Sequence, residues 1–268
     1  MPDGVPRANV FRVKLRQIAL AALVVLLLAA AAIYTQIRPR ITAVERGRRL
    51  AEATGCFGCH GPEGIHGTSN PGREEQTVPD WQGSLMMYAD NEEDVREWIR
   101  DGSTKSRRAS ESWKAARRSG ALRMPAFGRR LSKNDIEDLV AFVMACAGHP
   151  EPKDSLVTQG RDRAEALGCM GCHGVGGRFE RSNPGSFKGY VPSWDGPDFP
   201  DLVNGKDEFR QWVEHGVSDR FRRNQMAQFF LRRAPLHMPA FERHLAAGDV
   251  DALWAYVQWL RSGSAGRE

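Results

Sequence analysis

Two short motifs combine a pair of thiols with an imidazole. The pattern Cys-x-x-Cys-His occurs twice in the 268 residues. Thiols at this spacing can form thioethers with the two vinyl groups on one edge of a haem, and the adjoining imidazole can bind the iron from one face. Cys-x-x-Cys alone also occurs in redox-active dithiols and zinc sites, but the histidine favours covalent haem. The sequence therefore predicts two haem c groups, attached through Cys56, Cys59, Cys169 and Cys172, with His60 and His173 as iron ligands.

An internal repeat surrounds the two motifs. Residue i matches residue i+113 through both motifs, and the same Ser-Asn-Pro-Gly turn follows them at 69–72 and 182–185. Beyond one inserted residue the offset becomes 114, and Met-Pro-Ala-Phe occurs at 124–127 and 238–241. A unit of this size that occurs only twice indicates two globular domains with one haem each, and not a solenoid.

Each unit resembles a class I cytochrome c along its length. The resemblance rests on the haem motif, on a glycine nine residues before its first cysteine (Gly47 and Gly160) and on the downstream Met-Pro. It implies an all-α fold of two tandem class I cytochrome c domains, each wrapped around one covalent haem. In that family the methionine is the second axial ligand of the iron, which here would be Met124 and Met238. The alternative for both methionines is core packing.

The resemblance also suggests residues that contact the haem or its ligands. In the family a proline carbonyl accepts a hydrogen bond from the ligand histidine, and Pro71 and Pro184 are the candidates, eleven residues after each histidine. The alternative is an ordinary Asn-Pro-Gly turn. A tryptophan donates its indole N–H to a haem propionate in many relatives, and Trp81 and Trp194 are the candidates for that role.

The first 40 residues predict the compartment. A basic leader at 1–17 precedes a charge-free run at 18–37, which has the length of a bilayer-spanning helix. We expect an uncleaved transmembrane anchor, and the alternative is a cleaved signal peptide. Either interpretation places the haem domains outside the cytoplasm, where c-type haem is attached in bacteria. The expected location is the bacterial inner membrane, with the haem domains facing the periplasm.

The net charge of +5 does not indicate a nucleic-acid-binding protein. The first 40 residues hold six of the 38 basic side chains and one of the 33 acidic ones, so the remainder is formally neutral. Charge is nevertheless uneven, because nine Lys and Arg residues between 105 and 130 surround the approach to Met124. Such a cluster could steer an acidic redox partner or neutralise haem propionates, and the sequence does not separate the two roles.

The domain limits follow from the repeat and from a stiff polar segment. We place the first domain at 41–147, a linker at 148–156 and the second domain at 157–263. Apolar residues at helical intervals, with capping residues in places, predict six helices. Trp98 and Trp212 are expected on the apolar faces of two of them, and Cys146 as a buried apolar residue. The predicted helices cover 45–54, 91–100, 132–146, 158–167, 206–214 and 248–261.

Two classes of function agree with these features. The first is a membrane-tethered electron carrier, not an enzyme, that relays single electrons between a membrane or periplasmic donor and a redox partner. It could act alone or as a subunit of a respiratory or photosynthetic complex. The alternative is a di-haem enzyme such as a cytochrome c peroxidase, which needs one iron able to open a coordination site. Both units keep Met-Pro-Ala-Phe, which favours the carrier.

Overall fold

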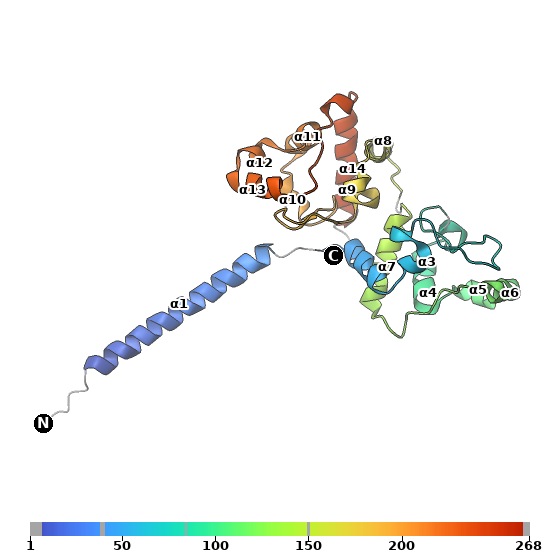
Figure 1. The fold of residues 1–268 in the computed structure, drawn as a ribbon, viewed down its shortest axis with the longest axis horizontal. Helices are drawn as coiled ribbons and strands as arrows, with labels where there is room; N and C mark the ends of the chain where they lie inside the picture. Colours follow the sequence, from blue (N-terminus) through green and yellow to red (C-terminus); the bar gives the residue numbers. More distant parts are fainter. Residues whose placement is uncertain (1–6, 38–40, 84, 149–150, 265–268) are drawn as a thin grey trace. The chain divides into compact units, whose positions relative to one another are not determined.

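The computed structural model describes residues 7–37, 41–83, 85–148 and 151–264. The chain divides into two compact units, Met1–Pro39 and Arg40–Glu268. The described part of the first unit is one helix, α1 (Arg7–Ile37), drawn in blue in Figure 1. The predicted linker at 148–156 includes residues 149–150, which lie outside the described residues, as do residues 1–6 of the predicted leader.

A correction concerns the N-terminal segment. Crossing the hydrocarbon core of a bilayer takes about 20 consecutive apolar residues in a helix. In the described part of the chain, no helix combines that length with that apolar character. This finding overturns the expected transmembrane helix over 18–37, and with it the membrane anchor.

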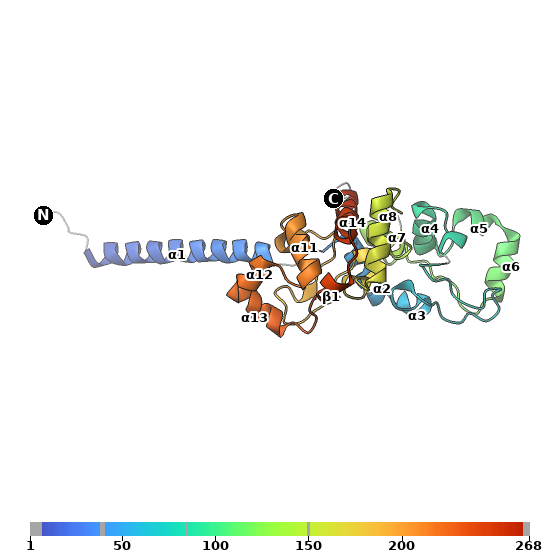
Figure 2. The ribbon, with the colours of Figure 1, turned by 90° about the horizontal axis from the view of Figure 1, so that it is seen from above.

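The larger unit is mostly helical, and the same succession of helices occurs in it twice (Figures 1 and 2). We call residues 41–147 the first repeat and residues 155–264 the second repeat, because the first helix of the second repeat begins inside the predicted linker. The first contains α2 (Ala43–Ala53), α3 (Phe57–His60), η1 (Pro62–Gly64), η2 (Leu85–Met87), α4 (Glu92–Asp101), α5 (Lys105–Ala109), α6 (Glu111–Ser119) and α7 (Lys133–Cys146).

The second repeat follows the same order and adds a small sheet. Strands β1 (Arg181–Ser182) and β2 (Tyr190–Val191) are antiparallel, with Arg181 opposite Val191. In the first repeat only an isolated bridge between Ser69 and Thr77 stands at this place. The helices are α8 (Ser155–Ala166), α9 (Met170–His173), η3 (Val175–Gly177), α10 (Phe199–Leu202), α11 (Lys206–His215), α12 (Asp219–Arg223), α13 (Gln225–Arg233), η4 (Glu242–His244) and α14 (Asp249–Ser264).

The six predicted helices are confirmed as α2, α4, α7, α8, α11 and α14. Capping side chains explain where several of them begin, because a side-chain oxygen can accept one of the unpaired N–H groups of the first turn. Ser132 and Asp135 form a reciprocal capping box at α7, and Asn91 accepts from the Asp94 N–H at α4. The short helices α5, α6, α12 and α13 were not predicted.

The first and last helices of each repeat cross at a glycine. A Cβ on Gly47 of α2 would lie 2.0 Å from the Asp138 carbonyl oxygen of α7, and one on Gly160 of α8 would lie 2.0 Å from the Ala252 carbonyl oxygen of α14. Only glycine allows backbones to approach so closely. Arg46 and Asp138 add a two-bond ion pair across the first crossing, at 2.7 and 2.8 Å. The same glycine position in both repeats therefore fixes how these helix pairs pack.

Each repeat has its own apolar core around its crossing. In the first, Phe142 of α7 is fully buried, and Cys146 is buried beside it, as expected. In the second, Tyr256 of α14 takes the corresponding place. Trp98 packs against the first core. The indole N–H groups of Trp98 and Trp212 donate to the carbonyls of Tyr88 and Leu202 at 2.9 Å.

Candidate haem-binding sites

One helical turn gathers the thiols and imidazole of each motif. In the first repeat α2 ends at Ala53, and the chain turns through Gly55 into α3. The N–H groups of Cys59 and His60 both donate to the Cys56 carbonyl, at 3.2 and 3.0 Å. The second repeat has the same bonds, from Cys172 and His173 to Cys169. All six side chains are half-buried, so each is partly shielded from solvent.

Each histidine is fixed by one ring nitrogen. The His60 Nδ1 lies 2.8 Å from the Pro79 carbonyl oxygen, and the His173 Nδ1 lies 3.2 Å from the Pro192 carbonyl oxygen. A carbonyl can only accept, so Nδ1 carries the proton and the Nε2 lone pair is available for a metal. Burial lowers the pKa of His60, and it lowers the pKa of His173 to about 4. Both rings are therefore neutral imidazoles, the form that binds iron.

The proline whose carbonyl accepts a hydrogen bond from each histidine is not the predicted one. The predicted residues were Pro71 and Pro184, but the observed acceptors follow the histidines by nineteen residues. The Pro71 carbonyl instead accepts from the Ala121 N–H at 3.0 Å. The spacing rule failed because the Ser-Asn-Pro-Gly turn points towards the segment before the methionine. The chain returns to the histidine only after that turn.

The asparagine of the same turn holds the segment that carries the methionine. Asn70 accepts from the Leu122 N–H at 2.8 Å and donates to the Leu122 carbonyl at 3.2 Å. Asn183 makes both bonds with Leu236, at 3.0 Å each. Both asparagines are buried, so these bonds are protected from water. Sequence reasoning missed this role, although the repetition of the turn was the available signal.

Two further contacts position each methionine. The Phe127 N–H donates to the Ile99 carbonyl of α4, and the Phe241 N–H donates to the Val213 carbonyl of α11, both at 3.0 Å. The Met124 and Met238 side chains are half-buried against the cores of their own repeats. These contacts are also what methionines that only pack in the core would make. The ligand role of the methionines therefore stays a prediction.

The predicted tryptophans lie against the histidines. The Trp81 and His60 ring centroids are 5.0 Å apart, and those of Trp194 and His173 are 4.9 Å apart. Both indoles are buried and also pack edge-on against the core aromatic of their own repeat, Phe142 or Tyr256. The observed contact is thus ring packing that supports the imidazole, while donation to a propionate stays a prediction.

The cysteine environment distinguishes haem attachment from dithiol chemistry. Burial raises the pKa of Cys56, and it raises the pKa of Cys169 to about 11. Reactive dithiols show the opposite, a pKa lowered by nearby positive charge or a helix N-terminus. A buried first thiol with a raised pKa, beside a neutral imidazole and with a thioether on a separate loop, fits covalent haem attachment.

The match to a protein-family model agrees with this geometry. The family model for cytochrome c matches residues 44–146. This segment is a cytochrome c domain. Such a domain implies covalently bound haem c and electron transfer. No curated protein matches the chain. Among solved structures, a chain of the reducing HAO-like protein complex of Kuenenia stuttgartiensis is 17% identical with a TM-score of 0.26, covering 84% of this chain and 98% of that chain.

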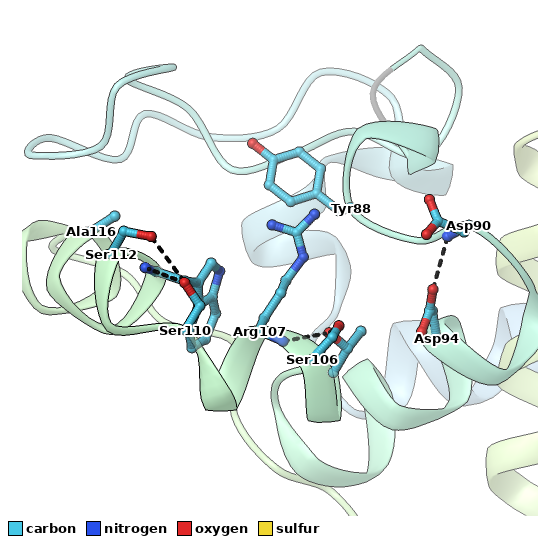
Figure 3. A pocket seen from close by; sticks show the side chains of 10 residues that line it. Tyr88, Asp90, Asp94, Ser106, Arg107, Ser110, Ser112 and Ala116 are labelled. Carbon is cyan, nitrogen blue, oxygen red and sulfur yellow. Dashed lines mark hydrogen bonds between the residues drawn. The ribbon is translucent and has the colours of Figure 1, made fainter.

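The basic cluster of the cytochrome c domain lies on α5, α6 and the methionine segment. Part of it is used within the protein, since Arg107 donates to the Met87 carbonyl at 2.7 Å and its guanidinium lies 5.3 Å from the Tyr88 ring centroid (Figure 3). Arg117 lies over Trp113 in the same way, at 5.4 Å. Tyr88, Arg107 and Trp113 line an open hollow beside α4. None of the haem-motif residues lines it, so the hollow is separate from the haem site.

Proposed function

We propose that the chain is a di-haem electron-transfer protein with a similar His/Met site in each repeat. The observation that carries the proposal is the repeated site geometry. Each repeat has an imidazole bonded through Nδ1 to a proline carbonyl, and a methionine segment held by a buried asparagine. The match to the cytochrome c family covers the first repeat, and the second is assigned by these corresponding bonds.

The residues have distinct roles in this proposal. Cys56, Cys59, Cys169 and Cys172 attach two haems, which supply one-electron iron couples. His60 and His173, together with Met124 and Met238, would hold the two irons. A thioether ligand favours the ferrous state and raises the reduction potential. The carbonyls of Pro79 and Pro192 orient the imidazoles and increase their basicity.

The methionine segments favour a carrier over a peroxidase. A peroxidase would need one iron with an open coordination site. In both repeats the segment is fixed at both ends, by the asparagine before the methionine and by a phenylalanine N–H after it. Both irons of the proposed protein are thus closed by a methionine. The proposed role is transfer of single electrons between redox partner proteins, as a free carrier or as a subunit of a larger oxidoreductase complex.

The proposed location is the bacterial periplasm. It rests on the chemistry of c-type haem, which bacteria attach outside the cytoplasm. The formally neutral charge of the residues after the first 40 agrees with protein partners and not with nucleic acid.

Optical spectroscopy of the purified protein tests the proposal. Two haems per chain, a far-red band from methionine bound to ferric iron, and no spectral change with carbon monoxide are expected. One haem per chain would contradict the assignment of the second repeat. Two haems with ready binding of carbon monoxide would contradict the closed carrier, and peroxide turnover would then identify the enzyme alternative.

A further inference from the structure

An aromatic side chain of the second repeat completes the core of the first. Phe179, which follows η3, is fully buried and belongs to the apolar core built around α7. Its ring centroid lies 5.1 Å from that of Phe142. Val175 of η3 also packs against this core. The loop after the second haem motif is therefore part of the structure of the first repeat.

Charged side chains border this contact on both sides. Arg181 forms an ion pair with Glu63, in which its Nη2 donates to Oε2 at 3.0 Å. Arg49 donates to Glu180 at 3.1 Å. Glu45, fully buried in α2, accepts from the Glu180 N–H at 3.4 Å. A buried ring within a rim of ion pairs is the arrangement of a specific interface, since the rim excludes water from the centre.

The ring of Phe179 stands between the two histidines in a chain of contacts. On one side, the centroids of Phe142 and Trp81 are 5.5 Å apart, and those of Trp81 and His60 are 5.0 Å apart. On the other side, the Phe179 N–H donates to the His173 carbonyl at 3.2 Å. A displacement of Phe179 therefore reaches the His60 imidazole through packed rings, and the His173 backbone through a hydrogen bond.

The two repeats differ at this point. In the second repeat, the hydroxyl of Tyr256 donates to the Gly176 carbonyl of its own η3 at 3.0 Å. Phe142, the counterpart of Tyr256, has no hydroxyl and packs against Phe179 instead. By the repeat offset Phe179 corresponds to His66, which is exposed. The contact is thus made in one direction only, from the second repeat into the first.

We infer that Phe179 is a positioning residue for the first haem site, and that its contact with Phe142 holds the two haem sites together for electron exchange within the chain. The inference rests on the proposed function. The step passes one electron from a ferrous to a ferric haem, and no bond or proton changes place. It depends on a fixed separation of the two sites, which the fully buried ring and the partly buried ion pairs at its border maintain together.

Three variants of the full-length protein test this inference. Phe179→Ala removes the ring, Phe179→Leu keeps an apolar group of similar size, and Phe187→Ala is the control because that phenylalanine of the same repeat is 60% exposed. The readouts are the potential of each haem and the rate of electron equilibration between haems after partial photoreduction. Met124→Ala identifies which potential belongs to the first haem.

Phe179→Ala should shift the potential of the first haem and slow the equilibration about tenfold, which is 1.4 kcal/mol in activation free energy. Phe179→Leu should keep the potential of the first haem and the equilibration rate close to their wild-type values. Phe187→Ala should change neither the potential nor the rate. If Phe179→Ala does not fold, Phe179→Leu carries the test through a smaller shift in the same direction. Unchanged potential and rate in a folded Phe179→Ala protein with two haems, or in Phe179→Leu where the alanine variant does not fold, would overturn the inference alone. A wild-type protein with one haem would overturn the proposed function as well.

Discussion

The carbonyl oxygen of Met124 passes so close to Gly102 that a Cβ on this glycine would lie 2.6 Å from it. Gly102 ends α4 in the left-handed conformation, with φ +72°. The same relationship joins Gly216 and Met238, where the distance would be 2.4 Å. Each methionine segment is therefore seated on the glycine that ends the preceding long helix.

Gly102→Ala should displace the methionine segment. The added Cβ meets the Met124 carbonyl in a conformation that alanine rarely adopts, so a loss of about 2–4 kcal/mol in unfolding free energy is expected. Gly148→Ala is the matched control, because it has φ +78° and no atom within 4 Å of the added Cβ. It should lose only about 1 kcal/mol. Chemical denaturation of both variants measures the difference, and equal losses would contradict the close approach.

Met124→Ala tests the ligand role of this methionine. Haem should stay attached through Cys56 and Cys59, while the potential of that haem falls and its iron becomes accessible to carbon monoxide. Met226→Ala is the control, since Met226 is 65% exposed on α13. Redox titration and carbon monoxide difference spectra provide the measurement. A Met124→Ala protein with wild-type spectra and potential would leave core packing as the role of Met124.

Asn70→Ala should loosen the methionine segment without removing the ligand. Two backbone groups of Leu122 lose their buried partner, and a loss of about 1–3 kcal/mol in stability is expected. The far-red methionine band should weaken at a lower temperature than in the wild type. Asn224→Ala is the control, because Asn224 caps the exposed helix α13. The idea fails if both variants lose the band at the wild-type temperature.

The pH dependence of the unfolding free energy should show the raised pKa of Glu180. Burial first, and the charge of Glu45 second, raise the pKa of Glu180 to about 7, above the 4.5 of a free glutamate. The folded protein then binds a proton that the unfolded chain releases between these values, so stability from this residue is complete below pH 4.5 and is lost as the pH rises through 7. The contribution is at most about 3 kcal/mol.

Glu180→Gln isolates this effect from other titrating groups. Glutamine cannot ionise, so the difference in melting temperature between wild type and variant should change with pH across the interval from 4.5 to 7. Glu52→Gln is the control, because the Glu52 side chain is 67% exposed. A difference that does not vary with pH would show that Glu180 is already ionised at the lower end of this interval.

The sequence by itself determined the cofactor chemistry and the helical framework. The spacing within Cys-x-x-Cys-His lies inside one helical turn, so no distant residue can alter which thiols and imidazole come together. The six long helices were also predictable, because apolar period and capping residues are local signals. The N-terminal apolar run was the exception. Its composition predicted a transmembrane helix that the described structure does not support.

Only the tertiary structure decided which groups meet across long separations. The acceptor for His60 is Pro79 and not Pro71, because the course of the intervening loop sets which carbonyl returns to the ring. The roles of Asn70 and Gly102 depend on contacts with a segment more than twenty residues away. Phe179 enters the core of the other repeat, and the repeat pattern alone would have assigned it to its own. Packing between distant segments, unlike local spacing, is chosen by the shape and burial of the whole unit.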